Sequence, residues 1–259
     1  MLRGVYSSVS AMLQLQAKQS ITSNNLANMN TTGYKSEMMV EKSFPEHMIS
    51  NKDSYKGGLA QKQNIGGLSF GVKIDDTITS FEQGTLIADE SNTTFAIVGD
   101  GFFTITDREG NTAYTRDGVF KITTDGYLMT SAGYLVQGIN LRTGALEPIY
   151  VGDAEVSIDP ENNINLNGVS TYRFNIVLPN NYDNFKLQAD NLYYGGDGIT
   201  AVNNANFTIK QRYKEGSNVD ITAETTSLMT TLRAFEANQT VVKAYDSTMD
   251  LVANQIGRI

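Results

Sequence analysis

The chain has 259 residues, enough for one large domain or two small ones with a buried core. Its formal net charge is -8, and without a Lys/Arg run this balance argues against binding to a nucleic-acid backbone. Because it has no cysteine and one histidine, His47, disulfides and thiolate metal sites are excluded and no histidine pair is left for a metal, so we expect no cofactor and no metal.

The sequence predicts neither a cleaved signal peptide nor a membrane span. Residues 1–11 lack the basic region and the unbroken apolar region that a cleavable signal peptide requires. No apolar run approaches the roughly 20 residues that a membrane-spanning helix needs. We therefore expect any export from the cytoplasm to follow a route that does not use such a signal.

Residues 1–33 are predicted to form a helix. Apolar residues recur at the spacing of one helix face, and the stripe includes Leu2, Val5, Val9, Met12, Leu26 and Met29. Gly33 follows two threonines and is a suitable helix stop. One interpretation of this segment is an ordinary amphipathic helix, and the other is a helix that pairs with further helices.

Amide side chains lie close to this apolar stripe. Asn24, Asn25 and Asn28 share about one face, because residues three and four apart are neighbours on a helix. Asparagine has a lower helix propensity than alanine, so the cluster suits a surface on which the amides bond to other chains. We hypothesise that these residues fix the register between subunits.

Residues 34–80 have a weaker pattern. Phe44-Pro45 excludes a continuous helix, and the pairs Gly57-Gly58 and Gly66-Gly67 interrupt the stretch. We predict an extended connection with one short strand around residues 69–74.

Residues 81–215 alternate with a period of two. Short apolar runs such as 102–106 and 119–122 are separated by turn pairs such as Asp117-Gly118 and Asp125-Gly126. Closely spaced strands without intervening helices predict an antiparallel sheet. The Asp-Gly pairs are better explained by hairpin turns than by calcium loops, because no Asp-x-Asp-x-Asp run with a properly spaced Glu is present.

Residues 216–259 carry the strongest pattern. Apolar residues recur at every seventh position, namely Ile221, Leu228, Phe235, Val242, Met249 and Ile256, and a second row consists of Leu232, Tyr245 and Val252. This repeat is typical of a helix packed lengthwise on other helices. The helix is predicted to be too long to bury its stripe on a core of its own, so it docks along one side of a domain or serves assembly.

Polar residues flank this second helix. Ser217 or Asn218 is expected to cap it, with Asp220 and Glu224 in the first turn. Arg233 and Glu236, off the apolar rows, are placed for a salt bridge to a neighbouring subunit or for a solvated face, and both interpretations remain open.

Together these segments predict an α+β chain. The helices of residues 1–33 and 216–259 are expected to pair as a coiled-coil-like stem. Residues 34–80 connect that stem to an antiparallel all-β domain, residues 81–215, which is inserted between the two helices.

Three stretches of the sequence match one family, in order. Ser23-Asn-Asn-Leu-Ala-Asn-Met-Asn-Thr-Thr-Gly-Tyr-Lys35 resembles the N-terminal signature of the bacterial flagellar basal-body rod and hook proteins. The runs 96–103, 114–120 and 126–130 resemble the β-domain core of that family. Gly216-Ser-Asn-Val-Asp220 and Arg233-Ala-Phe-Glu-Ala-Asn-Gln239 resemble its C-terminal signature. The total length is similar to that of the rod members, the distal and proximal rod subunits.

The resemblance implies a structural axial subunit of the flagellar basal body, with no enzymatic activity. In that family the terminal helices line the inner tube, the β-domain faces outward, and the flagellar type III export apparatus secretes the subunit without a cleaved signal peptide. Implied partners are identical subunits and other rod and hook proteins, not nucleic acid. We expect the subunit interface to include Asn24, Asn25, Leu26, Asn28, Leu228, Leu232, Arg233, Phe235, Glu236, Asn238, Val242 and Met249.

Two alternatives belong to other functional classes. A secreted β-rich hydrolase could draw on carboxylates such as Asp100, Asp107 and Asp117, although these residues lie in turns where aspartate has a conformational reason to occur. An adhesin-like binding module built on the β-domain is the other.

Overall fold

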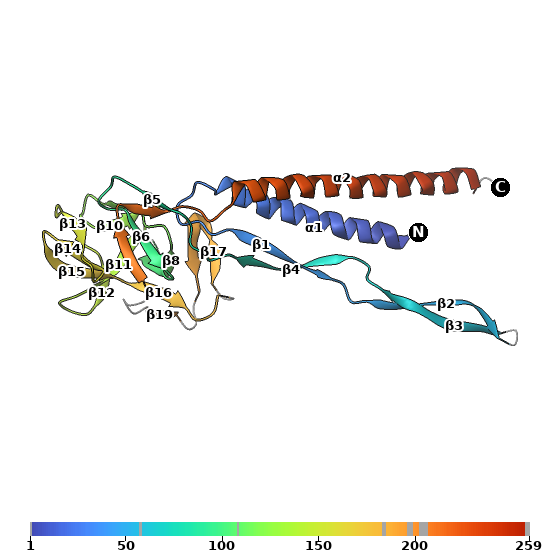
Figure 1. Ribbon diagram of the computed structural model, residues 1–259, viewed down its shortest axis with the longest axis horizontal. Coiled ribbons are helices and arrows are strands. Elements are labelled where there is room, and N and C mark those ends of the chain that lie inside the picture. Colours follow the sequence, from blue (N-terminus) through green and yellow to red (C-terminus); the bar gives the residue numbers. More distant parts are fainter. Residues whose placement is uncertain are drawn as a thin grey trace. The chain divides into compact units, whose positions relative to one another are not determined.

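The computed structural model describes residues 2–56, 59–107, 109–182, 185–195, 199–201 and 207–256 (Figure 1). The chain divides into two compact units, which we describe separately. Unit 1 comprises Met1–Ala27, Glu37–Ser80 and Asp220–Ile259, and unit 2 comprises Asn28–Ser36 and Phe81–Val219. The division differs from the expected boundaries, because residues 28–36 and 216–219 group with the β-domain and residues 37–80 group with the helices.

Two long helices dominate unit 1. α1 (Leu2–Ala27) and α2 (Ile221–Leu251) lie side by side and antiparallel, and α2 continues into a short π-helix, η3 (Val252–Ile256) (Figure 1). The two predicted terminal helices are therefore present, although α1 ends at Ala27 and does not reach Gly33. None of the described helices has the length and hydropathy to span a bilayer.

The cap of α2 is Asp220, and the expectation of Ser217 or Asn218 is wrong. The Asp220 carboxylate accepts the N–H groups of Thr222 and Ala223, at 2.8 and 3.2 Å. An oxygen in this position satisfies backbone donors that the first helical turn leaves without partners. Asn218 is engaged elsewhere, since its Oδ1 accepts the Ser36 N–H at 2.7 Å in unit 2.

A β-ribbon occupies the stretch that we expected to be mostly a connection. β1 (Glu37–Ser43) pairs with β4 (Val72–Thr79), and β2 (His47–Lys56) pairs with β3 (Leu59–Leu68), all antiparallel. The one strand that we expected here, around residues 69–74, overlaps only the start of β4. The Gly57-Gly58 pair lies outside the described residues.

The ribbon is irregular and carries apolar side chains on its surface. Shifts in register interrupt both strand pairs, at Val40/Glu41 in the first and at two places in the second. Large apolar side chains on the ribbon, among them Met38, Met48, Ile65 and Ile78, are exposed.

Unit 2 is an antiparallel β-domain, as predicted. Among the described residues, thirteen strands belong to one sheet whose main path is β13-β14-β15-β11-β7-β8-β18-β17, and β20-β6 and β21-β5 form separate pairs. The strands are β5 (Leu86–Ala88), β6 (Phe95–Gly99), β7 (Phe102–Thr106), β8 (Thr112–Thr115), β9 (Phe120–Ile122), β10 (Leu128–Thr130), β11 (Leu135–Asn140), β12 (Leu146–Pro148), β13 (Val156–Ile158), β14 (Asn163–Leu166), β15 (Val169–Phe174), β16 (Ile176–Pro179), β17 (Lys186–Gln188), β18 (Leu192–Tyr194), β19 (Ile199–Ala201), β20 (Phe207–Gln211) and β21 (Tyr213–Glu215), with a 3-10 turn, η1 (Ala189–Asn191).

The core of the β-domain is aromatic. Phe95, Phe103, Phe120 and Phe174 are buried and contact one another edge to face or tilted, with ring centroids 5.1 to 6.2 Å apart. Such ring pairs add to the free energy of burial itself. β7 is buried on both faces, because Phe103 packs in this core and Phe102 packs in a second cluster with Val177, Phe185 and Tyr193.

Candidate functional site

The side chains between α1 and α2 are small or polar at many positions. Gly4 packs against the ring of Tyr245 at one end of the helix pair, and Asn25 bonds to Glu224 at the other. Shielded positions on α2 follow each other in steps of four and three: Glu224, Leu228, Thr231, Phe235, Asn238, Val242 and Tyr245. On α1 the buried positions are Ser8, Gln14, Thr22 and Asn25, and many of the positions between them are half-buried, so the spacing of shielded residues is less regular than on α2.

Large apolar side chains lie on the outside of this helix pair. On α1, Tyr6 is 68% exposed and Leu13 is 63% exposed, and on α2, Met229 is 57% exposed. Further exposed apolar residues on the two helices are Val9, Ile221, Leu232, Val241, Met249 and Leu251. Tyr6, Val9 and Leu13 lie on one stripe of α1, and an exposed apolar stripe of this kind typically marks a surface that another protein covers.

An apolar pocket adjoins the outer face of α1 within unit 1. Its volume is about 470 Å³, and its lining comes from one stripe of α1 and from residues beside the start of β2 and the end of β3. The lining residues are Tyr6, Val9, Ser10, Leu13, Phe44, Pro45, His47 and Phe70. The outer side of α1 is therefore both apolar and hollowed. His47, the only histidine, is exposed here with its ring 5.4 Å from that of Phe70.

The residues expected at a subunit interface fall into two groups. The structure shields some of them inside their own chain and leaves others outside. Shielded wholly or in part are Asn25, Leu26, Asn28, Leu228, Phe235, Asn238 and Val242, and exposed are Asn24, Leu232, Arg233, Glu236 and Met249.

Two details differ from the pattern of the sequence. Of the second apolar row only Tyr245 faces α1, because Leu232 and Val252 are exposed and Thr231 and Asn238 take inner positions. Arg233 and Glu236 belong to no ion pair within the described part of the chain.

Asn25 has bonds within its own chain that the sequence did not suggest. It is 1% exposed, and its Nδ2 donates to the Glu37 carbonyl and to Glu224 Oε1, both at 2.9 Å. Its Oδ1 accepts the Glu37 N–H at 3.0 Å. The side chain thus binds the first residue of β1 as a neighbouring strand would, and it ties α1 to the first turn of α2.

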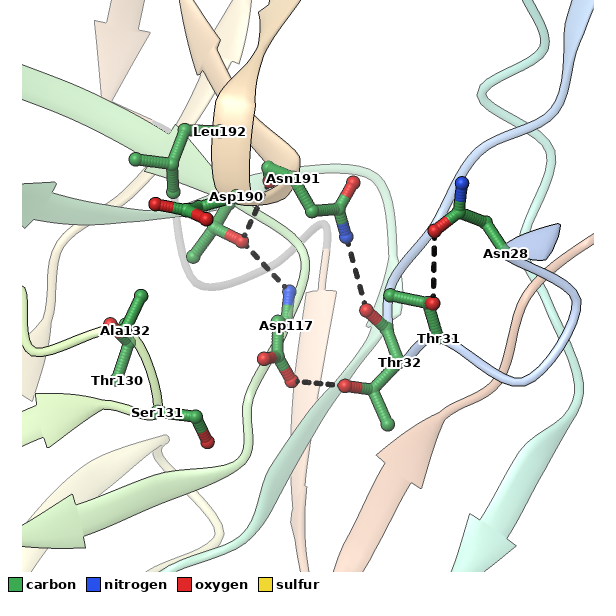
Figure 2. Close-up of a pocket in the computed structure, with 11 residues that line it drawn as sticks. Asn28, Thr31, Thr32, Asp117, Thr130, Ser131, Ala132, Asp190, Asn191 and Leu192 are labelled. Atoms are coloured by element: carbon green, nitrogen blue, oxygen red, sulfur yellow. Dashed lines mark hydrogen bonds between the residues drawn. The ribbon is translucent and has the colours of Figure 1, made fainter. Parts of the chain in front are cut away.

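In unit 2 the end of the N-terminal signature contacts the centre of the β-domain. Thr32 Oγ1 donates to Asp117 Oδ1 at 2.7 Å, and Asn191 Nδ2 donates to the Thr32 carbonyl at 3.1 Å (Figure 2). Asp117 is part of the Tyr-Thr-Arg-Asp-Gly run. These bonds border a pocket of about 300 Å³, and most of the residues that line it have hydroxyl, amide or carboxylate side chains (Figure 2).

Gly33 allows this close approach. Its φ is +67°, and an added Cβ would lie 2.5 Å from the Asp117 nitrogen and 2.6 Å from the Arg116 carbonyl carbon. Only glycine has the conformation and the lack of side chain that this contact requires. Its role is thus to let two backbones meet, and the expectation that it stops the helix is wrong, because α1 already ends at Ala27.

A buried ionic cluster joins the three matched stretches. Lys35 Nζ donates to Glu215 Oε1 and Arg116 Nε donates to Glu215 Oε2, both at 2.6 Å. Lys35 is 1% exposed, Glu215 2% and Arg116 4%. We call these three residues the ionic triad. Buried charges are tolerated when they are paired and their remaining hydrogen-bonding groups are satisfied.

The remaining polar groups of the ionic triad have backbone partners. Lys35 Nζ also donates to the Glu82 carbonyl at 2.7 Å, and Glu215 Oε1 accepts the Gly84 N–H at 3.0 Å. The Arg116 guanidinium donates to the carbonyl groups of Ile97, Gly99 and Gly101. The triad therefore connects segments that are far apart in the sequence.

Burial shifts two pKa values in this region. Burial lowers the pKa of Lys35, and the nearby Glu215 carboxylate partly opposes this shift. Burial raises the pKa of Asp117, against the opposing effect of the hydrogen bonds from Thr32 and Val119. Both pKa shifts arise because the ionisable groups of Lys35 and Asp117 are buried where chain segments of the β-domain meet.

The residues of the ionic triad cannot be recognised from the sequence alone. Lys35, Arg116 and Glu215 are ordinary charged residues there, and the available signal was that each lies in or directly beside a matched stretch. Among the described residues, no group of three His, Cys, Asp or Glu side chains is placed to hold a metal ion.

The helices leave large apolar side chains exposed, and the buried charges of the β-domain join segments of its own chain. These features are those of a structural subunit. Three family models match the chain in order. They are "flagella basal body rod protein" over residues 5–35, "flagellar hook protein FlgE/F/G D1 domain" over residues 96–192, and "flagellar basal body rod FlgEFG protein C-terminal" over residues 210–256.

Individual relatives match over nearly the full length. The flagellar basal-body rod protein FlgG of Bacillus subtilis is 32% identical over 278 residues, which span 98% of this chain and 99% of the relative. The flagellar hook-basal body complex protein FlhO of the same organism is 28% identical over 277 residues and 100% of both chains. The flagellar hook protein FlgE of Helicobacter mustelae matches a shorter part, with 38% identity over 143 residues, 53% of this chain and 31% of the relative.

The chain belongs to the family of flagellar basal-body rod and hook proteins. It is an axial structural subunit of the flagellum and not an enzyme, as the resemblance implied. The matches give no support to the hydrolase or to the adhesin-like module.

Proposed function

We propose that the chain is a subunit of the basal-body rod and polymerises with identical copies into a helical tube that transmits torque from motor to hook. Support comes from the relatives that match over the full length, because FlgG of Bacillus subtilis is described as a rod protein. The hook protein FlgE of Helicobacter mustelae is matched over only 31% of its length. Head-to-tail contacts that do not close into a ring produce such a helical array.

The exposed apolar face of the helix pair is the observation that carries this proposal. Tyr6 and Leu13 on α1, and Met229 on α2, are all more than half exposed. Burying one such side chain contributes about 1.5 to 3 kcal/mol. The free energy of assembly in this proposal comes mainly from copies that cover these side chains.

We further propose that α1 and α2 pair as a coiled-coil-like stem. On α2 shielded positions such as Leu228, Thr231 and Phe235 are spaced by three and four residues, which is the spacing that keeps one face toward a partner helix. In this arrangement residues such as Thr231 and Ala11 let the two helices approach closely. The expected interface then separates into inner residues that shape the stem and outer residues that meet other subunits, namely Asn24, Leu232, Arg233, Glu236 and Met249.

The proposed partners are other rod and hook proteins and the flagellar type III export apparatus. In this proposal the chain reaches the basal body by that apparatus without a cleaved signal peptide. The support is that the relatives matched over their full length, FlhO and FlgG of Bacillus subtilis, are described as components of the basal body.

A pair of substitutions on α1 tests assembly. Leu13→Ser removes an exposed apolar side chain, and the control Gln16→Ser changes an exposed polar residue of the same helix. From the transfer free energy of one leucine, we expect Leu13→Ser to raise the concentration needed for assembly by roughly tenfold or more, and Gln16→Ser to leave it unchanged. Sedimentation and electron microscopy measure assembly, and circular dichroism checks that helix content is equal.

The proposal fails if the Leu13→Ser variant assembles at the same concentration as the wild type with unaltered filaments. It also fails if both variants impair assembly equally, because the effect would then not depend on apolar surface.

A further inference from the structure

The ionic triad is built from residues that are far apart in the sequence. Lys35 and Glu215 are 180 positions apart, and Arg116 and Glu215 are 99 apart. Lys35 lies near the end of the first segment of unit 2, Asn28–Ser36, and Glu215 lies near the end of the second segment, Phe81–Val219. We call Asn28–Ser36 the entering segment. The placement of the entering segment therefore depends on Glu215, which follows almost the whole β-domain in the sequence.

Glu215 is the only carboxylate that pairs with both buried cations among the described residues. Its Oε1 serves Lys35 and the Gly84 N–H, while its Oε2 serves Arg116. Without this carboxylate, the fold would bury two neighbouring positive charges whose other bonds go only to neutral carbonyl groups. Removing one partner from a buried ion pair is far more costly than never forming the pair.

Backbone bonds hold the same two segments together. The Gly33 N–H donates to the Glu215 carbonyl at 2.9 Å, and the Ser36 N–H donates to Asn218 Oδ1 at 2.7 Å. The Asn218 N–H donates to the Tyr34 carbonyl at 3.4 Å. The entering segment is therefore bonded directly to the residues that carry and follow Glu215.

We propose that Glu215 is a latch that holds the entering segment in the β-domain, and that this segment docks only after Glu215 is in place. The carboxylate makes burial of Lys35 beside Arg116 favourable, and the backbone bonds then form around it. A chain that folds from its N-terminus onward thus leaves the entering segment undocked until residue 215 is available. This proposal concerns the folding of a single chain and does not depend on the assembly of subunits.

Hydrogen exchange measured by mass spectrometry on the full chain tests the latch. Glu215→Gln keeps the shape of the side chain and removes its charge. We expect amide exchange in residues 30–37 to become faster by about a hundredfold or more, while residues 102–115 at the β7–β8 pairing keep their protection. Lys35→Met removes the Lys35 bonds to Glu215 and to the Glu82 carbonyl but leaves the Arg116–Glu215 pair intact, so it is expected to accelerate exchange in the entering segment much less than Glu215→Gln does.

The double variant Lys35→Met/Glu215→Gln decides the mechanism. In the wild type two cations and one carboxylate give the triad a net charge of +1, and in the double variant Arg116 alone gives the same net charge. The protection of residues 30–37 from amide exchange should therefore recover relative to Glu215→Gln. If Glu215→Gln alone does not fold, recovery of a folded β-domain in the double variant supports the latch in the same way.

Three results would overturn the proposal. The first is unchanged exchange of residues 30–37 in Glu215→Gln. The second is an equal acceleration in residues 30–37 and 102–115, which would make Glu215 an ordinary core residue. The third is a double variant that is no better protected or folded than Glu215→Gln.

Discussion

Replacing Gly33 with alanine should weaken the β-domain far more than the same change at a glycine with similar backbone geometry. Gly33 has φ +67° and Gly144 has φ +71°. An added Cβ at Gly33 would lie 2.5 Å from the Asp117 nitrogen, whereas at Gly144 it would meet nothing within 4 Å. Both variants therefore carry the same conformational strain, and only Gly33→Ala adds a clash with backbone that cannot rotate away.

The magnitudes follow from these geometries. A left-handed conformation costs an alanine roughly 1 kcal/mol, which is the whole effect expected for Gly144→Ala. At Gly33 the entering segment must move away, which weakens the bonds from Gly33 to Glu215 and from Thr32 to Asp117, at 2.9 and 2.7 Å. With about 1 kcal/mol for the strain, about 1 kcal/mol for each bond and a further 1 to 2 kcal/mol for displaced packing, Gly33→Ala should cost about 4 to 5 kcal/mol.

Urea unfolding followed by tyrosine fluorescence measures both variants, since the chain has 13 tyrosines and no tryptophan. The difference between the two free energies of unfolding isolates the cost of the close approach. If Gly33→Ala is no less stable than Gly144→Ala, within about 0.5 kcal/mol, the backbone contact is not what glycine provides at this position.

Two further predictions concern single polar groups. Asn25→Ala removes three hydrogen bonds from a buried side chain and should lower the stability of unit 1 by about 2 to 3 kcal/mol, whereas Ser23→Ala, at an exposed position of the same helix, should change it by less than about 0.5 kcal/mol. Circular dichroism at 222 nm during urea unfolding compares them, and equal losses would remove the special role of Asn25. Because burial raises the pKa of Asp117 above its ordinary value of 3.8, the stability that this group contributes is complete below that value and is lost as the pH rises through the folded-state pKa. Asp117→Asn should therefore gain stability relative to the wild type as the pH rises from about 4 to 7, measured as urea midpoints, and a gap that does not depend on pH would contradict this assignment.

Features set by neighbouring residues could be predicted from the sequence. The seven-residue repeat that includes Leu228, Phe235 and Val242 predicted α2, because helical packing leaves a periodic trace in a continuous stretch. Runs such as Phe102–Thr106 predicted β7 for the same reason. The cap of α2 was placed too early because Asn218 is also a suitable capping residue, and its engagement with Ser36 is a tertiary contact.

The β-ribbon was missed because its pattern is irregular. Register shifts at Val40/Glu41 and Ile49/Ser50 reverse the face to which successive side chains point, so no alternation persists along the strands. With apolar residues such as Met48 and Ile65 exposed, the stretch also lacks the inside-outside contrast that identifies a strand.

The ionic triad could not be predicted from local patterns at all. Lys35, Arg116 and Glu215 are brought together by the fold across 99 and 180 positions, and no periodicity relates them. A lysine or a glutamate in a loop normally indicates a solvated side chain, since such residues are rarely fully buried without a partner. Only the structure shows that each has one.

The first segment of the β-domain lies beside the end of its second segment, where the Gly33 N–H bonds to the Glu215 carbonyl and the Asn218 N–H bonds to the Tyr34 carbonyl. A domain with neighbouring ends can be lengthened, shortened or exchanged while the flanking helices keep their own sequence and spacing. A foreign module would therefore have to replace residues 28–36 and 81–219 together if the terminal helices and the β-ribbon of residues 37–80 are to stay unchanged.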